Sequence, residues 1–250
     1  MTPLFDAESG EPLALLDGAS MNPFKTGAAG AVAVDALARE DATEIAVIGS
    51  GAQARGQLAA TATVRAFESV RVFSPTAESR EAFADAFDDR LDATVSAAES
   101  AGAAVDGADV IVTATTASDP VIDDADVAPG AHVTAMGQYD PDRNELPPEL
   151  VARATYVPDI RERATQDAGS FLAARSAGLI GDDHVAADLG EVVAGRHPGR
   201  TSDGEVTVFD SGGTGIETVA AAHMLYERAS EAGRGKTIEF APASEALTGE

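Results

Sequence analysis

A G-x-G-x-x-A pattern follows a short apolar run in the first quarter of the chain. Residues 45–48 are all apolar, and the residues that come next are Gly49, Ser50, Gly51, Ala52, Gln53 and Ala54. In this pattern the first glycine makes a tight turn, the second lets the backbone approach a pyrophosphate, and the third small residue keeps helix and strand close. The helix N-terminus then offers free N–H groups to the diphosphate. The segment predicts a dinucleotide-binding loop; the alternative is a glycine turn without a ligand.

The residues after the next expected strand bear on the choice of cofactor. NAD-binding proteins usually carry an Asp or Glu there, which binds the ribose diol. Residues 73–76 read Phe-Ser-Pro-Thr and contain no acid. The hydroxyls of Ser74 and Thr76 and the guanidinium of Arg80 favour the 2′-phosphate of NADP. NAD stays possible, and Arg80 is then a solvated helix residue.

Further candidates stand where other strands are expected to end. Ligands of open α/β sheets bind at the carboxyl ends of the strands. We expect these residues to contact the nicotinamide half of the cofactor, and they are Thr115, Thr116, Met136, Gly137 and Ser211. The alternatives are strand threonines with β propensity, a core methionine and a helix cap by Ser211 or Thr214, which could coexist with binding.

Charged residues near this edge are candidates for substrate chemistry. Lys25, one of two lysines in the chain, adjoins an alanine-rich segment and is a candidate anchor for a substrate carboxylate. The alternative is an ordinary surface ion pair. Asp140 stands on a loop after an expected strand and is a candidate for proton transfer, although most loop charges are merely solvated. The histidines show no metal-binding spacing, and we expect no metal site.

Periodicity predicts the elements that position these residues. Strands are expected at residues 4–6, 12–16, 44–48, 70–74, 93–96, 110–115, 133–137, 156–159 and 206–211. Helices are expected at 26–39, 53–67, 77–87, 146–154 and 216–232, with a loop at 178–183. The first two strands form a hairpin, which is marginal alone and needs a partner.

The alternation of strands and helices predicts an α/β fold. Right-handed crossovers give a Rossmann-type, doubly wound parallel sheet. We place a nucleotide-binding domain at residues 41–212. Residues 1–40 are then part of an incomplete second domain, for substrate binding and dimerisation, to which a C-terminal helix in 213–250 returns.

Composition limits the partners. The net charge is −25, from 42 acidic and 17 Lys or Arg residues. Such a field repels nucleic acid and anionic membranes, and it is tolerable in a high-salt cytoplasm where charges are screened. The alternative is simply an acidic mesophilic protein. No Cys is present, which excludes disulfides and fits a reducing cytoplasm.

Several segments resemble the ornithine cyclodeaminase/mu-crystallin family over essentially the whole chain. The matching stretches are residues 4–6, 13–17, 25–29, 47–54, 114–118, 137–146, 188–195 and 207–214. The resemblance implies a Rossmann domain that binds NAD(H) or NADP(H), a homodimer, and chemistry on amino or imino acids. It begins partway into the family pattern, so a segment that supplies a catalytic lysine and basic carboxylate ligands has no counterpart here.

Two departures from the family pattern bear on the reaction. Cyclodeaminases carry an aspartate two residues after the glycine that ends the fifth strand, where this chain has Tyr139, with Asp140 next. The family's arginine before Thr-Gly-Ala is Lys25. A tyrosine suits proton donation in a ketimine reductase or alanine dehydrogenase better than base catalysis. We therefore expect an NAD(P)-dependent oxidoreductase of a small amino or imino acid. The alternatives are ornithine cyclodeamination and a non-catalytic cofactor-binding protein.

Overall fold

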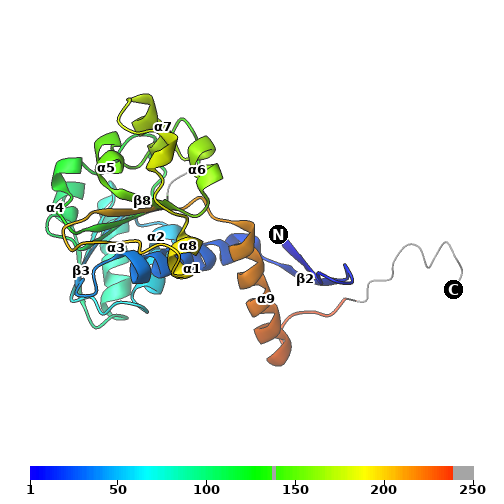
Figure 1. Cartoon of the computed structure of the whole chain (residues 1–250). Helices are drawn as coiled ribbons and strands as arrows, with labels where there is room; N and C mark the ends of the chain where they lie inside the picture. Colours follow the sequence, from blue (N-terminus) through cyan, green and yellow to red (C-terminus); the bar gives the residue numbers. More distant parts are fainter. Residues whose placement is uncertain (137–138, 239–250) are drawn as a thin grey trace, which may run out of the picture.

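The computed structural model describes residues 1–136 and 139–238, which form an α/β protein with one large sheet and one small one (Figure 1). In chain order its elements are β1 (Thr2–Phe5), β2 (Pro12–Leu16), α1 (Gly18–Leu37), β3 (Glu44–Ile48), α2 (Ala52–Thr61), β4 (Ser69–Phe73), α3 (Ala77–Asp88), β5 (Thr94–Ala97), α4 (Ala101–Val105), β6 (Val110–Thr113), η1 (Asp124–Asp126), β7 (His132–Ala135), α5 (Pro148–Arg153), β8 (Thr155–Pro158), α6 (Arg161–Asp167), α7 (Gly169–Ser176), η2 (Asp182–His184), α8 (Leu189–Val193), β9 (Thr207–Asp210) and α9 (Gly215–Glu231).

The large sheet is parallel, with the strand order β5-β4-β3-β6-β7-β9-β8. The chain runs outward from β3 in one direction and then from β6 in the other, so the strand order reverses between these two strands. Such a reversal opens a crevice at the carboxyl ends of the strands. The doubly wound Rossmann-type architecture expected from the sequence is confirmed.

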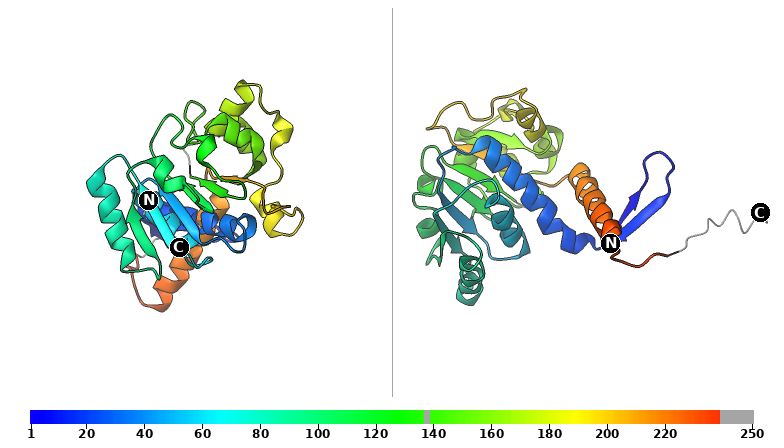
Figure 2. Two further views of the ribbon diagram at one scale, coloured as in Figure 1. Left: turned by 90° about the vertical axis from the view of Figure 1, so that its left-hand side faces the viewer. Right: turned by 90° about the horizontal axis from the view of Figure 1, so that it is seen from below.

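Successive side chains of β3 pack into the hydrophobic clusters on opposite faces of the sheet, which explains why all residues from 45 to 48 are apolar. Ile45 and Val47 pack with α1, α2 and α3, whereas Ala46 and Ile48 pack on the face covered by α4, α5 and α7. A strand buried on both faces needs apolar residues at every position. The helices accordingly cover both faces of the sheet (Figure 2).

The N-terminal hairpin of β1 and β2 stands apart from the large sheet (Figures 1 and 2). Leu4 of β1 forms a small apolar cluster with Met21 of α1 and Ala222 of α9. The helix α9 therefore supplies the packing partner that an isolated hairpin lacks. The domain division at residues 40/41 and 212/213 stays a prediction.

The largest boundary differences concern α1 and α2. The helix α1 begins at Gly18, eight residues before the expected start, because the Asp17 carboxylate caps it by accepting from the N–H groups of Ala19 and Ser20 at 3.1 and 3.3 Å. It continues through Pro23, which sequence rules read as a helix breaker. The helix α2 ends at Thr61 rather than at residue 67.

Short helices that the sequence did not predict are α4, α6, α7 and α8. They have five to eight residues, too few for a clear 3.6-residue period. The expected loop at 178–183 is found, and η2 begins within it. In the part of the chain that the structure describes, none of the helices is both long and apolar enough to pass through a membrane.

Candidate functional site

The carboxyl edge of the large sheet gathers the polar residues that the sequence singled out. Ser50 follows β3, Ser74 follows β4, Thr115 follows β6, Met136 follows β7 and Ser211 follows β9. These residues come from segments up to 161 positions apart in the chain, and the parallel topology alone brings them to one edge. The predicted cofactor residues therefore lie along the edge at which a strand-order reversal is expected to open a crevice.

The two glycines of the phosphate loop play different parts. Gly49 has a φ of +119°, and a Cβ there would lie 2.3 Å from the carbonyl oxygen of Ala114, so only glycine fits. At Gly51 a Cβ would meet no protein atom within 4 Å. Gly51 is also the N-cap of α2 and makes no side-chain cap hydrogen bond. The open space before an uncapped helix N-terminus fits a bound diphosphate.

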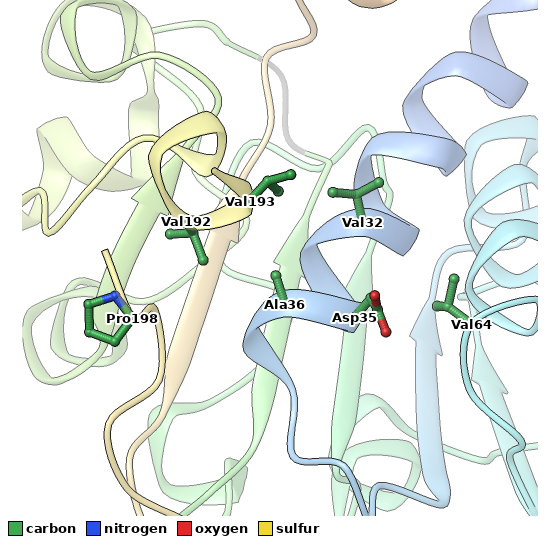
Figure 3. Close-up of a pocket in the computed structure, with 7 residues that line it drawn as sticks. All are labelled: Val32, Asp35, Ala36, Val64, Val192, Val193 and Pro198. Atoms are coloured by element: carbon green, nitrogen blue, oxygen red, sulfur yellow. The ribbon is translucent and has the colours of Figure 1, made fainter. Parts of the chain in front are cut away.

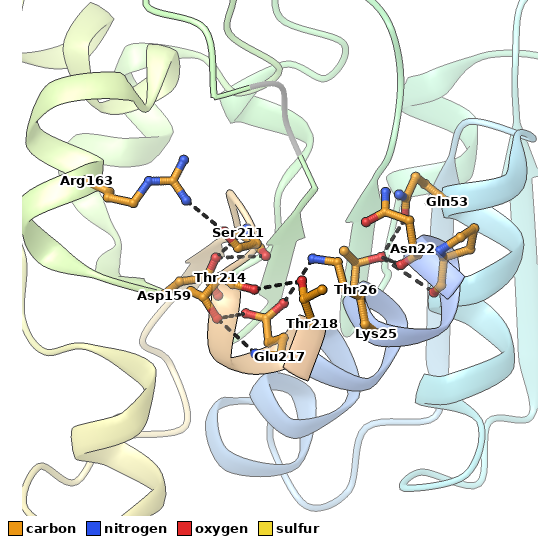
Figure 4. Close-up of polar contacts among 12 residues, drawn as sticks. Asn22, Lys25, Thr26, Gln53, Asp159, Arg163, Ser211, Thr214, Glu217 and Thr218 are labelled. Carbon is orange, nitrogen blue, oxygen red and sulfur yellow. Dashed lines mark hydrogen bonds and ion pairs between the residues drawn. The ribbon is translucent and has the colours of Figure 1, made fainter. Parts of the chain in front are cut away.

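One turn of α1 is fixed against the phosphate loop. The Thr26 hydroxyl donates to Gln53 Oε1 at 2.6 Å (Figure 4). Gln57 Nε2 donates to the Thr26 carbonyl at 2.7 Å. The helices approach so closely that a Cβ on Gly27 would lie 2.5 Å from the carbonyl oxygen of Gly56. The small residues of both segments thus bring Lys25 and Thr26 to the cofactor loop. Ala52 is exposed and Ala54 is buried under the loop.

The residues expected to choose the cofactor form one cluster. Ser74 is buried, accepts a hydrogen bond from the Ser50 hydroxyl at 3.0 Å and donates to the Thr76 carbonyl at 3.3 Å. Arg80 Nη1 donates to the Ser74 carbonyl at 3.0 Å, and its guanidinium carbon lies 5.7 Å from the ring centroid of Phe73. Arg80 therefore lies against the end of β4 rather than extending into solvent.

A carboxylate that the sequence analysis missed organises the end of β6. Glu145 is 3% exposed and accepts hydrogen bonds from Thr113 Oγ1 at 3.0 Å and from the Thr115 N–H at 2.6 Å. The Thr115 hydroxyl also donates to it. Burial raises the pKa of Glu145, and the hydrogen bonds from Thr115 and Thr113 oppose that rise. The Thr115 proton is therefore engaged with protein, which leaves the exposed Thr116 as the better donor toward a ligand.

A further cofactor candidate, Met136, lies beside this turn in the sheet order. The Met136 N–H donates to the Thr113 carbonyl at 2.8 Å, which extends the β6–β7 pairing, and its side chain is half-buried. Gly137, the neighbouring candidate, lies outside the described residues.

Lys25 lies at the same edge, facing the start of α9. Its Nζ is 3.8 Å from Glu217 Oε2, and the two side chains are 12% and 18% exposed. A Cβ on Gly213 would lie 3.1 Å from Lys25 Nζ. Glu217 Oε2 is buried and accepts no hydrogen bond from any described residue. The ion pair is thus neither a surface contact nor a tight bridge.

Tyr139 reaches the turn after β9 through both its hydroxyl and its ring. The hydroxyl donates to the Asp210 carbonyl at 3.2 Å, and the ring faces Gly212, where a Cβ would lie 2.5 Å from ring carbons. Burial raises the pKa of Tyr139 well above its usual value, and the charges of Asp210 and Asp159 add to the rise. The side chain therefore stays protonated at neutral pH and is not a base there.

Asp140, the next residue, makes different contacts. Its carboxylate pairs with Arg143 Nε at 3.5 Å and accepts the Asp142 N–H at 3.1 Å, and its side chain is 46% exposed. The backbone of Asp140 and Arg143 packs on Gly169 of α7. The structure brings Tyr139, but not Asp140, against the turn after β9.

Two carboxyl groups lie under that turn. Asp159 Oδ2 accepts from Ser211 Oγ at 3.0 Å and from the Gly213 N–H at 2.8 Å, and Asp210 accepts from the Tyr156 hydroxyl at 2.6 Å. Burial raises the pKa of Asp159 to about 6 and that of Asp210 to about 7. Of the two residues expected as alternatives to cap the following helix, Thr214 caps α9, whereas the Ser211 hydroxyl donates to Asp159.

Glu145, Asp159 and Glu217 were not among the predicted site residues. Asp159 directly follows β8, so the strand-end rule that selected Ser211 would have found it as well. Glu145 and Glu217 carry no such signal, because each is one of many acids in an acidic chain.

A groove of about 420 Å³ lies elsewhere, between the C-terminal half of α1 and α8 (Figure 3). Of its lining residues only Asp35 is ionisable, and Asp35 pairs with Arg65 at 3.0 Å. The groove therefore lacks the polar groups that a catalytic site needs.

Comparisons with known proteins agree with this geometry. The model of the family described as "Ornithine cyclodeaminase/mu-crystallin family" matches residues 1–233. A Delta(1)-pyrroline-2-carboxylate reductase of Bacillus cereus is 38% identical over 238 residues, which cover 95% of this chain and 73% of that protein.

Two solved structures have the same fold over nearly the whole chain. The Thermococcus litoralis Delta(1)-pyrroline-2-carboxylate reductase, in complex with NADH and L-proline, matches with a TM-score of 0.92 and 35% identity over 94% of this chain and 73% of its own. An archaeal alanine dehydrogenase dimer with bound NAD matches with a TM-score of 0.89 and 35% identity, covering 95% of this chain and 73% of its own.

Proposed function

The chain belongs to the ornithine cyclodeaminase/mu-crystallin family, and on that basis we propose that it is an NAD(P)-dependent oxidoreductase that interconverts an imino acid and an α-amino acid. When bound, a nicotinamide cofactor would supply a hydride, with its two electrons, for the carbon of the C=N bond. The nitrogen must gain one proton to complete the amine. The remaining requirements are a carboxylate anchor, a proton donor and a site that holds both in near-attack geometry.

The observation that carries the proposal is the placement of one turn of α1. Thr26 binds Gln53 of the phosphate loop at 2.6 Å, while the adjoining Lys25 reaches the turn after β9. A single helical turn thus links the cofactor loop to a cation at the same crevice. We assign Lys25 to the substrate carboxylate.

We assign Tyr139 to proton donation toward the substrate nitrogen. Its hydroxyl stays protonated because burial raises its pKa, and it lies at the turn that Lys25 also approaches. Asp140 is the alternative proton donor. We favour Tyr139 because the Asp140 carboxylate pairs with Arg143 and does not reach the turn after β9.

The cofactor-binding assignment covers the loop of residues 49–54 and the ends of the neighbouring strands. The site fits a dinucleotide because Gly51 leaves open space before the uncapped α2. Thr116, Met136 and Ser211 stand at the nicotinamide end of the crevice, with Thr115 held by Glu145. The similar structures contain NADH or NAD; for this chain we propose NADP(H), supported by Ser74, Thr76 and Arg80 in place of an acid.

We also propose that the protein forms a homodimer in a high-salt cytoplasm. The hairpin and α9 expose large apolar side chains, among them Phe5, Leu15, Ile216 and Val219. Side chains of this kind mark interaction surfaces when they are adjacent. The net charge of −25 supports a high-salt environment, and the absence of Cys supports a reducing cytoplasm.

The proposal is tested by a substrate screen in molar KCl. Cyclic imines, and 2-oxo acids with ammonia or methylamine, are offered with NADH and with NADPH, and cofactor oxidation is followed. The variant Lys25→Met is expected to raise the KM for the imino acid by about ten-fold or more while cofactor affinity stays unchanged. Lys236→Met, at the only other lysine, which is exposed, is the matched control. Equal KM values for Lys25→Met and parent would contradict the assignment of Lys25.

A further inference from the structure

A buried carboxyl group joins the loops that follow β6 and β7. Glu145, in the loop after β7, is 3% exposed. Its carboxylate accepts from Thr113 Oγ1 at 3.0 Å and from the Thr115 N–H at 2.6 Å, and the Thr115 hydroxyl also donates to it. These donors are neutral groups rather than a cation. The hydrogen bonds from the two threonines therefore compensate for the burial of Glu145.

The hydrogen bonds of Thr115 extend this contact along the backbone. Its hydroxyl proton is directed to Glu145, and its hydroxyl oxygen accepts the Ala117 N–H at 3.1 Å. A threonine oxygen that accepts from the N–H two residues further on stabilises a tight turn. Glu145 thereby holds the backbone of residues 114–117 through Thr115.

Residues 114–117 border the phosphate loop. The Ala114 N–H donates to the Ile48 carbonyl at 2.8 Å, and a Cβ on Gly49 would lie 2.3 Å from the Ala114 carbonyl oxygen. The contact joins the ends of β3 and β6, the neighbouring strands between which the strand order reverses. The turn after β6 therefore lies beside the phosphate loop at the point where a dinucleotide crosses the sheet.

Glu145 also belongs to the loop that carries Tyr139. Its carbonyl accepts the Val121 N–H at 3.0 Å, and the Asn144 N–H donates to the Ser118 carbonyl at 3.3 Å. The loops after β6 and β7 are thus paired through their backbones as well as through the Glu145 carboxylate. This pairing sets the position of the turn after β6 relative to the loop of the assigned proton donor.

We propose that Glu145 is a positioning residue that holds residues 114–117 in the conformation that binds the nicotinamide riboside half of the cofactor. The inference rests on the proposed function, which places that half at the ends of β6, β7 and β9. Glu145 acts through Thr115, because its own carboxylate is buried against the two threonines. The diphosphate and adenosine half is assigned to residues 49–54 and the end of β4, so its binding does not depend on Glu145.

The test separates the two halves of the cofactor. Calorimetry measures the Kd of NADH and NADPH, and of ADP and 2′-phospho-ADP, which end at the diphosphate. Glu145→Ala removes the acceptor, and Glu145→Gln keeps one oxygen for Thr115. Glu145→Ala should weaken the binding of the intact dinucleotides by about ten-fold or more and leave the affinity for both fragments unchanged. Glu145→Gln should recover most of the lost affinity.

Glu205→Ala is the matched control. Glu205 also accepts from threonines, namely the Thr155 hydroxyl and the Thr201 hydroxyl, the latter at 3.1 Å. Thr155 begins β8, so this carboxylate lies at the amino edge of the sheet, opposite to the cofactor residues. Its removal should lower the melting temperature and change none of the four Kd values.

Three results would overturn the inference. They are a Glu145→Ala variant that binds the dinucleotides like the parent, a Glu145→Ala variant that loses fragments and dinucleotides equally, and a parent that binds dinucleotides no more tightly than fragments. The second result would mean that Glu145 only stabilises the sheet. Reduction of a cyclic imine by the parent is followed separately. Its absence would contradict the proposed reaction and leave the comparison of affinities valid.

Discussion

The hydroxyl of Ser50 donates a hydrogen bond to the hydroxyl of Ser74 at 3.0 Å, which joins the phosphate loop to the end of β4. Ser74 is 6% exposed and stands where NAD-binding proteins carry an acid. The contact places the residue that we expect to determine the cofactor preference directly beside the loop that we propose binds its diphosphate.

We predict that Ser74→Asp changes the preference from NADP(H) to NAD(H). A carboxylate at this position accepts from a ribose diol and repels a 2′-phosphate. Fluorescence titration of NADH and NADPH with parent and variant measures the ratio of their Kd values. Asp85→Asn, on the exposed face of α3, is a control for a local change of charge. A parent protein that binds NADH more tightly than NADPH would show the NADP prediction to be wrong.

Gly51→Val should abolish cofactor binding without lowering the melting temperature. The added side chain enters space that the protein leaves open but a pyrophosphate needs. Gly49→Ala should instead lower the melting temperature, because its Cβ would lie 2.3 Å from the Ala114 carbonyl oxygen at a φ of +119°. Calorimetric titration and thermal denaturation measure both. Equal titration curves for Gly51→Val and the parent protein would contradict the assignment of residues 49–54 as the phosphate loop.

The melting temperature should rise with KCl concentration. A net charge of −25 destabilises the compact state by self-repulsion, and screening shortens the Debye length from about 10 Å at 0.1 M to about 3 Å at 1 M. A variant with Glu81→Gln and Asp85→Asn, both exposed on α3, should respond less to salt. A melting temperature that stays flat between low and molar KCl would refute the prediction.

His132 should make the protein less stable as the pH falls below 6.5. Its ring is fully buried between the hydroxyls of Thr207 and Thr134, at 2.9 and 3.0 Å, and burial lowers its pKa to about 3. Between pH 6.5 and about 3 the unfolded chain binds a proton that the folded chain does not. The free energy of unfolding therefore decreases as the pH is lowered through this range.

His132→Gln removes this dependence. Between pH 7 and 5 the parent should lose about 2 kcal/mol more than the variant in denaturant unfolding at fixed salt. Asp210, whose pKa is raised to about 7, has the opposite effect, with stability lost as the pH rises through 7. Both proteins share that contribution, so it cancels in the comparison. Parallel pH profiles would contradict the prediction.

The chain should form little proline from L-ornithine and should reduce a cyclic imine faster. Cyclodeamination needs a base beside the substrate. Tyr139, which stands where cyclodeaminases carry an aspartate, stays protonated because burial raises its pKa. Tyr139→Phe should lower imine reduction by about 10²-fold with unchanged cofactor affinity. Tyr226→Phe, in the hairpin cluster with α9, is the control. Rapid proline formation with catalytic NAD would overturn this assignment and favour Asp140 as the base.

The short-range parts of the site were predictable from the residues alone. An apolar strand, two glycines at the spacing of a phosphate loop and a helix start are consecutive in residues 45–54, so the local pattern predicts the loop. The same holds for the alternation that produced the parallel sheet. The Ala114 carbonyl that excludes a Cβ at Gly49 is known only from the folded chain. The start of α1 was missed because Pro23 suggests a break, whereas the capping hydrogen bonds of Asp17 secure the preceding turn.

Which side chains meet at the carboxyl edge was decided only by the tertiary structure. Lys25 and Glu217, Arg163 and Gly213, and Glu145 and Thr115 are pairs of residues 30 to 192 positions apart. Their pairing depends on the strand order and on the close approach of α1 to α2, and no local preference encodes either. The sequence therefore determined the fold and the phosphate loop, because nearest-neighbour sterics and periodicity suffice for both. The partners of Lys25, Tyr139 and Thr115 required the packed sheet, because burial and distance exist only once distant segments are brought together.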